Sequence, residues 1–186
     1  MSGSLKRALS LWAASKVAGL HVYADDIANV KHQFPSCTVI EVSRDVGPTG
    51  CGRSDYKVRD GSSGNVAAIG RVHREVTVYR LTISAPSDTQ RNGQEVVDGI
   101  LGIIEKAVLQ AAMSNASLVL SDTETTPEES FAVESIRLQG RQSIPPDISG
   151  EPVVYRGAMS LEVTRLVPLE RPVENVIERI HVVEDR

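Results

Sequence analysis

The sequence predicts an α+β protein: a mostly antiparallel β-sheet with a long amphipathic helix and an N-terminal helix packed on one face. Three features indicate this class. Several segments alternate apolar and polar residues, only one long segment shows helical apolar spacing, and loops rather than helices join most of the predicted strands. About four to six strands are expected for a sheet of this kind.

The fold is expected to form around residues 76–112. Apolar and β-branched residues occupy every second position of residues 77–83, as in a half-buried strand, and Pro86 ends this pattern. Ser87 or Asp88 is expected to cap the helix that follows. The apolar residues of this helix recur at three- and four-residue steps: Val97, Ile100, Leu101, Ile104, Val108 and Ala111. The adjacent strand is the nearest surface on which that stripe can pack.

Other segments complete the predicted sheet and its helices. A helix is expected at residues 4–17, where apolar residues share one face. Strands are expected at residues 21–23, 37–43, 132–139 and 153–167. Residues 140–152 are rich in turn formers, including Pro145 and Pro146, and are expected to form a turn.

The predicted organisation is a single domain over residues 1–168 and a C-terminal arm over residues 169–186. Glycine and serine concentrate in residues 46–70, which predicts a loop or the tip of a long hairpin, with room for a short strand at residues 56–58. Pro168 marks the start of a linker. The final residues fit a helix or a strand equally, and we interpret them as an extended arm that packs elsewhere, such as on another subunit.

The composition argues against several classes of protein. The chain has 186 residues and a formal net charge of −4, so a protein that wraps nucleic acid, which needs a basic surface, is not expected. No apolar run reaches the ~18–20 residues that span a bilayer, so no membrane partner is expected. Two cysteines do not make a disulfide framework, which favours synthesis in the cytosol.

The sequence contains no motif that predicts an enzyme, a cofactor or a metal site. It has no glycine-rich phosphate loop and no nucleophile elbow, and its four histidines and two cysteines lack metal-ligand spacing. The adjacent carboxylates Asp25 and Asp26 fit a helix cap better than a paired acid–base site.

Two features could serve assembly. Cys51 lies between two glycines in the predicted loop, where it is either a free thiol or the partner of a cysteine in a neighbouring subunit, whereas Cys37 is expected to be buried. An acidic run without Lys or Arg contains Asp122, Glu124, Glu128, Glu129 and Glu134. This run is either a solvated loop or a surface that lines a passage for DNA, because carboxylates repel phosphates.

The order of these elements resembles that of the tail terminator proteins of long-tailed bacteriophages. The resemblance lies in the N-terminal helix, the step from Phe34–Pro35 into the strand at 37–43, the large hairpin, the strand and helix of residues 79–109, and the strand YRGAMSLEVTRLV at 155–167. It covers residues 4–167 as a pattern rather than as a single motif. The glycine-rich loop and the arm depart from the family pattern, which leaves a related neck, collar or tail-completion protein as an alternative.

The resemblance implies a structural virion protein without catalytic residues. It implies a homo-oligomeric ring, a hexamer, that caps the head-proximal end of the tail tube, ends tail polymerisation and joins the tail to the neck. The implied partners are the tail tube protein, a sheath protein and neck or connector proteins, while DNA passes through the lumen without specific binding. Assembly is expected in the host cytoplasm and the final location in the virion. A baseplate or tube component is a further alternative, and a small enzyme is a more distant one.

Overall fold

The computed structural model describes residues 5–23, 33–48, 55–59, 66–87, 92–114, 118–123, 127–150 and 152–172. The chain divides into two compact units. Unit 1 comprises Met1–Asp45 and Val76–Arg165, and unit 2 comprises Val46–Glu75 and Leu166–Arg186. Three strands, β2, β4 and β8, contribute residues to both units.

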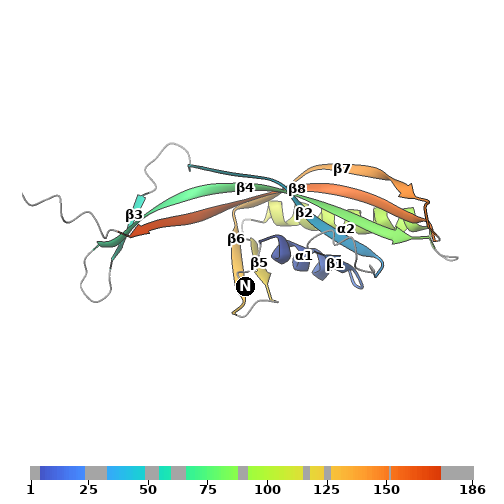
Figure 1. The fold of residues 1–186 in the computed structure, drawn as a ribbon, viewed down its shortest axis with the longest axis horizontal. Coiled ribbons are helices and arrows are strands. Elements are labelled where there is room, and N and C mark those ends of the chain that lie inside the picture. The colour runs from blue at the N-terminus through green and yellow to red at the C-terminus, as the bar shows by residue number, and fades with distance from the viewer. Residues whose placement is uncertain are drawn as a thin grey trace, which may run out of the picture. The chain divides into compact units, whose positions relative to one another are not determined.

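The described elements are two helices and eight strands, which confirms the predicted α+β class (Figure 1). In chain order they are α1 (Leu5–Lys16), β1 (His21–Tyr23), β2 (Ser36–Pro48), β3 (Asp55–Arg59), β4 (Val66–Pro86), α2 (Gly93–Met113), β5 (Leu118–Asp122), β6 (Glu129–Val133), β7 (Ser135–Asp147) and β8 (Val154–Pro172). The helices α1 and α2 therefore agree closely with the segments predicted from apolar spacing.

Six of the strands form one sheet with the order β1-β2-β4-β8-β7, and β3 pairs with β4 off this path. The pairs β3–β4 and β7–β8 are antiparallel, whereas the short β1 pairs with β2 in parallel. The arrows of β4, β8 and β7 alternate in direction in Figure 1. A mostly antiparallel sheet is thus confirmed. The strands β5 and β6 form a separate two-stranded antiparallel sheet.

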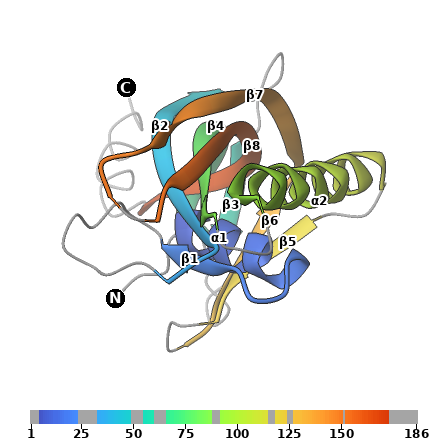
Figure 2. The same ribbon diagram turned by 90° about the vertical axis from the view of Figure 1, so that its right-hand side faces the viewer.

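The core of unit 1 lies between the sheet and the helices. Every second residue of β4 and β8 is buried there, because successive side chains of a strand point to opposite faces. The buried strand residues are Tyr79, Leu81, Ile83, Met159, Leu161 and Val163, and they share one cluster with Val97, Leu101 and Ile104 of α2 and with Leu9 of α1. Helix α1 contacts α2, β1, β5 and β6, and Figure 2 shows the two helices beside each other below the arch of β7.

The start of α2 differs from the prediction. The helix begins at Gly93, and its N-cap is Asn92, whose side-chain oxygen accepts a hydrogen bond of 3.0 Å from the amide of Gln94. Ser87 is not the cap, although its hydroxyl oxygen accepts a hydrogen bond of 3.1 Å from the amide of Gly93. The loop before α2 is therefore longer than predicted, and the other predicted cap, Asp88, lies outside the described residues.

The predicted turn at residues 140–152 is wrong over most of its length, because β7 continues to Asp147. Strand β7 lies at the edge of the main sheet, and its pairing with β8 shifts register between Ile144 and Asp147, which places Pro145 and Pro146 in the irregular part. Proline lacks an N–H for the ladder and is tolerated at edges and bulges. The composition that suggested a turn is therefore compatible with this strand.

Two further boundaries differ. Strand β8 runs to Pro172, so the linker predicted at Pro168 is wrong, and the tail from residue 173 lies outside the described residues. Within residues 46–70, β2 extends to Pro48 and β3 occupies Asp55–Arg59, where a short strand was expected.

Candidate assembly interface

The face of the main sheet that points away from the helices carries a depression in unit 1. Leu81 and Ile83 of β4 are buried in the core, so the intervening Thr82 and Ser84 point to the opposite face. Together with residues of β2 and β8 they line a depression of ≈ 310 Å³. Its lining residues are Phe34, Ser36, Thr38, Ile40, Thr82, Ser84, Val154 and Arg156. The depression thus spans three adjacent strands.

Apolar side chains are exposed in and beside this depression. Phe34 and Ile40 line it, and Val42 follows at the next outward position of β2. The exposed fractions are 41% for Phe34, 39% for Ile40 and 52% for Val42. An apolar patch on a sheet face is a common feature of surfaces that bind another protein. We call this surface, formed by the depression and Val42, the sheet face.

A polar cluster fixes one side of the sheet face. Arg156 donates a hydrogen bond of 2.8 Å from Nη2 to Oδ2 of Asp147, and Ser149 donates to Oδ1 from its hydroxyl at 2.5 Å and from its amide at 3.0 Å. The hydrogen bonds from Ser149, followed by the charge of Arg156, lower the pKa of Asp147. Asp147 is therefore an anion at neutral pH and holds the guanidinium of Arg156 beside the depression.

The outer side of helix α2 exposes three apolar side chains among polar ones such as Lys106 and Gln110. Ile103, Leu109 and Met113 point away from the core with exposed fractions of 47%, 52% and 84%. A Cβ built at Gly99 or Gly102 would meet nothing within 4 Å, so this side of the helix is open. We call this surface, formed by Gly99, Gly102, Ile103, Leu109 and Met113, the helix face.

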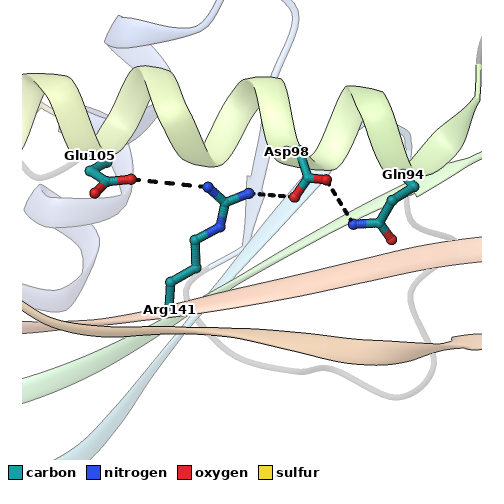
Figure 3. Close-up of polar contacts among 4 residues, drawn as sticks. All are labelled: Gln94, Asp98, Glu105 and Arg141. Atoms are coloured by element: carbon teal, nitrogen blue, oxygen red, sulfur yellow. Dashed lines mark hydrogen bonds and ion pairs between the residues drawn. The ribbon is translucent and has the colours of Figure 1, made fainter.

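The flank of α2 is tied to the edge strand β7 by one arginine (Figure 3). Arg141 pairs with Asp98 through a short hydrogen bond and lies 4.0 Å from a carboxylate oxygen of Glu105. Gln94 donates a further hydrogen bond of 3.1 Å to Asp98. The carboxylates of Asp98 and Glu105 are seven residues apart, which places them about two helical turns apart on one side of the helix, so the guanidinium of Arg141 reaches both.

The structure tests the prediction for one of the two cysteines. Cys37 is fully buried, as expected, and burial raises the pKa of its thiol to about 12. Its thiolate, the nucleophilic form, is therefore not populated near neutral pH. Cys51 lies outside the described residues, so its pairing with a neighbouring subunit stays a prediction.

The residues of the predicted acidic run differ in their exposure to solvent. Asp122 is buried at the end of β5, with Oδ2 3.9 Å from Nε of Arg7 on α1, so its carboxylate is not part of an acidic surface. Glu128 and Glu134 are exposed and Glu129 is half-buried, whereas Glu124 lies outside the described residues. The sequence contained a signal for this burial, since Asp122 shares the alternation of Leu120 on β5.

Neither a metal site nor a membrane-spanning helix is found in the part of the chain that the structure describes. Its His, Cys, Asp and Glu side chains do not gather in groups of three or more that could hold a metal ion. Neither α1 nor α2 combines the length and the apolar character required to cross a bilayer.

The exposed apolar residues of the sheet face and the helix face could not be predicted from the sequence, because alternation alone does not tell which face of a strand the helices cover.

The chain matches no protein-family model and no curated protein sequence.

Proposed function

We propose that this protein is a structural subunit of a long-tailed bacteriophage that forms a ring at the head-proximal end of the tail tube, ends tail polymerisation and joins the tail to the neck. The observation that carries the proposal is the sheet face, which exposes Phe34, Ile40 and Val42 around a depression on the side of the sheet opposite the helices. A ring subunit needs surfaces of this kind to contact its neighbours.

The order of the elements supports the same proposal. An N-terminal helix, a sheet of long strands and a single long helix between β4 and β5 agree with the pattern on which the resemblance to tail terminators rests. In the proposed subunit the two helices cover one face of the sheet. The segment of residues 46–70 and the tail after β8, residues 173–186, reach adjacent subunits in this proposal, and Cys51 lies near a subunit boundary.

The exposed acidic residues fit a passage for DNA. Glu128 and Glu134 carry exposed side chains on or beside β6 and would repel phosphates at the wall of a channel. Asp122 has no part in this, because it is buried against α1. The proposed partners are the tail tube protein, a sheath protein and the neck or connector proteins.

Deletion of the gene from the phage tests the function. Particles without the protein should contain tails of uncontrolled length that fail to join filled heads, and a plasmid copy of the gene should restore tails of normal length. Normal tails joined to filled heads in the deletion strain would contradict the proposal. Immunogold labelling then separates the alternatives, because a label at the distal end would indicate a baseplate component and a label at the neck with normal tail length a collar protein.

A further inference from the structure

Residues Asn92 and Gly93 form the only Asn-Gly dipeptide in the sequence, and the structure places it at the start of α2. In such a dipeptide the backbone nitrogen of the glycine can attack the side-chain amide carbon of the asparagine, because glycine has no Cβ that hinders the approach. The new N–C bond closes a succinimide ring, and the amide proton leaves with the side-chain NH2 group as ammonia. Water then opens the ring at either carbonyl carbon and yields aspartate or isoaspartate.

Both residues of this dipeptide have a structural role. The side-chain oxygen of Asn92 caps α2 by accepting a hydrogen bond of 3.0 Å from the amide of Gln94, and asparagine is among the preferred residues at this position. A Cβ at Gly93 would lie 2.7 Å from Cδ2 of Tyr155 and 2.9 Å from the backbone oxygen of Ala85. A larger residue at 93 would therefore force the backbone to move, so the packing retains a reactive dipeptide.

The geometry of the cap opposes the reaction in the folded state. Asn92 has an extended backbone with ψ at 120°, which turns the nitrogen of Gly93 away from the side chain of Asn92. The amide of Gly93 also donates a hydrogen bond of 3.1 Å to the hydroxyl oxygen of Ser87. Ring closure requires rotation about the Cα–C bond of Asn92, and this rotation breaks the hydrogen bonds to Ser87 and from Gln94. The reaction therefore needs the first turn of α2 to open.

Opening of this turn is accessible in the native protein. The ends of helices open at a lower free energy than their interiors, since their terminal backbone groups lack intrahelical partners. Asn92 is exposed, so water can reach the succinimide. We propose that Asn92 is a site of spontaneous deamidation whose rate is set by opening of the N-terminal turn of α2. The reaction needs only this chain and water, so it does not rest on the proposed function.

The two products have opposite consequences for α2. Aspartate at position 92 keeps the side-chain acceptor and adds a negative charge where the helix dipole favours one. Isoaspartate carries the backbone through the side chain and so inserts a methylene group before Gly93. Gly93 packs tightly against Tyr155 and Ala85, so this insertion loosens the start of the helix.

Incubation of the full-length wild type in buffer and in guanidinium chloride at the same slightly alkaline pH tests the proposal. Trypsin releases residues 92–106, and fragment ions in the mass spectrum assign the conversion to Asn92 rather than to Asp98. The folded protein should deamidate about tenfold more slowly than the unfolded protein, or more slowly still, because opening breaks two hydrogen bonds. Equal rates in the two states, or no conversion in the unfolded chain, would overturn the proposal.

Variants of one serine identify the protecting contact. Ser87→Ala removes the acceptor of the Gly93 amide and should raise the rate in the folded protein about fivefold, while the rate in guanidinium chloride should not change. Ser87→Thr keeps the hydroxyl and should stay close to the wild type. Ser114→Ala is the matched control, since it removes a serine hydrogen bond of 2.9 Å at the other end of α2 and should leave the rate unchanged.

Circular dichroism establishes that each variant is folded before its rate is compared. A folded Ser87→Ala that deamidates as slowly as the wild type, or a Ser114→Ala that deamidates as fast as Ser87→Ala, would overturn the proposed gating. If Ser87→Ala does not fold, the comparison of the folded and unfolded wild type decides the question.

Discussion

Gly157 of β8 lies directly against Leu101 of α2. A Cβ built at Gly157 would approach Leu101 Cδ1 and Val97 Cγ1 to 2.8 Å, closer than real side chains pack. Leu101 and Val97 are buried in the core between the helix and the sheet. The absence of a side chain at this position therefore sets how closely α2 approaches β8.

The first prediction follows from that contact. Gly157→Ala should lower the free energy of unfolding by about 1–3 kcal/mol, because the added methyl group forces α2 away from the strand. Gly140→Ala is the matched control on the paired strand β7, since a Cβ there meets nothing within 4 Å. Urea denaturation of both variants measures the difference, and equal stability would show that α2 can shift without cost.

The second prediction concerns the phase of α2. Ile104 is fully buried, so Ile104→Asp should unfold unit 1, because an unpaired buried carboxylate costs several kcal/mol, roughly the total stability of a domain. Val119→Asp places the same charge at an exposed apolar site. It should change the free energy of unfolding by no more than about 1 kcal/mol. A cooperative thermal transition of Ile104→Asp near that of the wild type would contradict the described packing.

The third prediction concerns the buried thiol. In a Cys51→Ser background, Cys37 should not react with a maleimide in the native protein and should react fully in guanidinium chloride. The reason is its burial, which excludes the reagent and raises the pKa of the thiol to about 12. Rapid labelling of the native protein would show that β2 opens readily.

The same thiol should make the protein sensitive to alkali. The unfolded thiol ionises above its ordinary pKa of 9.0, whereas the folded thiol stays protonated up to about 12, so the unfolded state binds fewer protons in this window and stability falls as pH rises. At about one pH unit above the unfolded pKa the loss is about 1.4 kcal/mol. Urea denaturation at two pH values should show this loss in the wild type and not in Cys37→Ala.

The fourth prediction concerns the pairing of α2 with β7. Arg141→Ala should destabilise unit 1 by only about 0.5–1 kcal/mol, because Arg141 and both of its carboxylate partners are more than one-third exposed and solvent screens the charges. A double-mutant cycle with Asp98→Ala isolates the interaction, with an expected coupling of about 0.5 kcal/mol. Coupling indistinguishable from zero would mean that the contact serves orientation alone.

Periodicity was sufficient to predict the main elements of unit 1. The strand pattern ending at Pro86 and the apolar stripe of α2 correspond to β4 and to the helix Gly93–Met113. The long strands were predicted too short at one end, because Gly47 in β2 and Pro168 in β8 were read as breaks. A neighbouring strand can keep such residues in the ladder, and that information is not local to the sequence.

The candidate interface was beyond what the sequence could predict. Ile40 and Ile103 have the same chemistry as the core residues beside them, and only the packing of the helices on one face of the sheet decides that they are exposed. Asp122 is the opposite case, because its charge suggested solvent and the fold buries it beside Arg7. Strand β6 was also missed, since the acidic residues Glu128 and Glu129 at its start obscured a five-residue pairing with β5.

The two prolines at the end of β7 have a consequence for solubility. An edge strand exposes unpaired backbone N–H and C=O groups, which can pair with a strand of another molecule and so start aggregation. Neither Pro145 nor Pro146 has an N–H group, so this end of the edge strand offers fewer hydrogen-bond donors to another chain, at the point where the pairing with β8 is already irregular. Growth by addition of strands to that end of the sheet is thereby disfavoured. The same end of β7 is therefore protected against the edge-to-edge strand pairing that leads to fibrils.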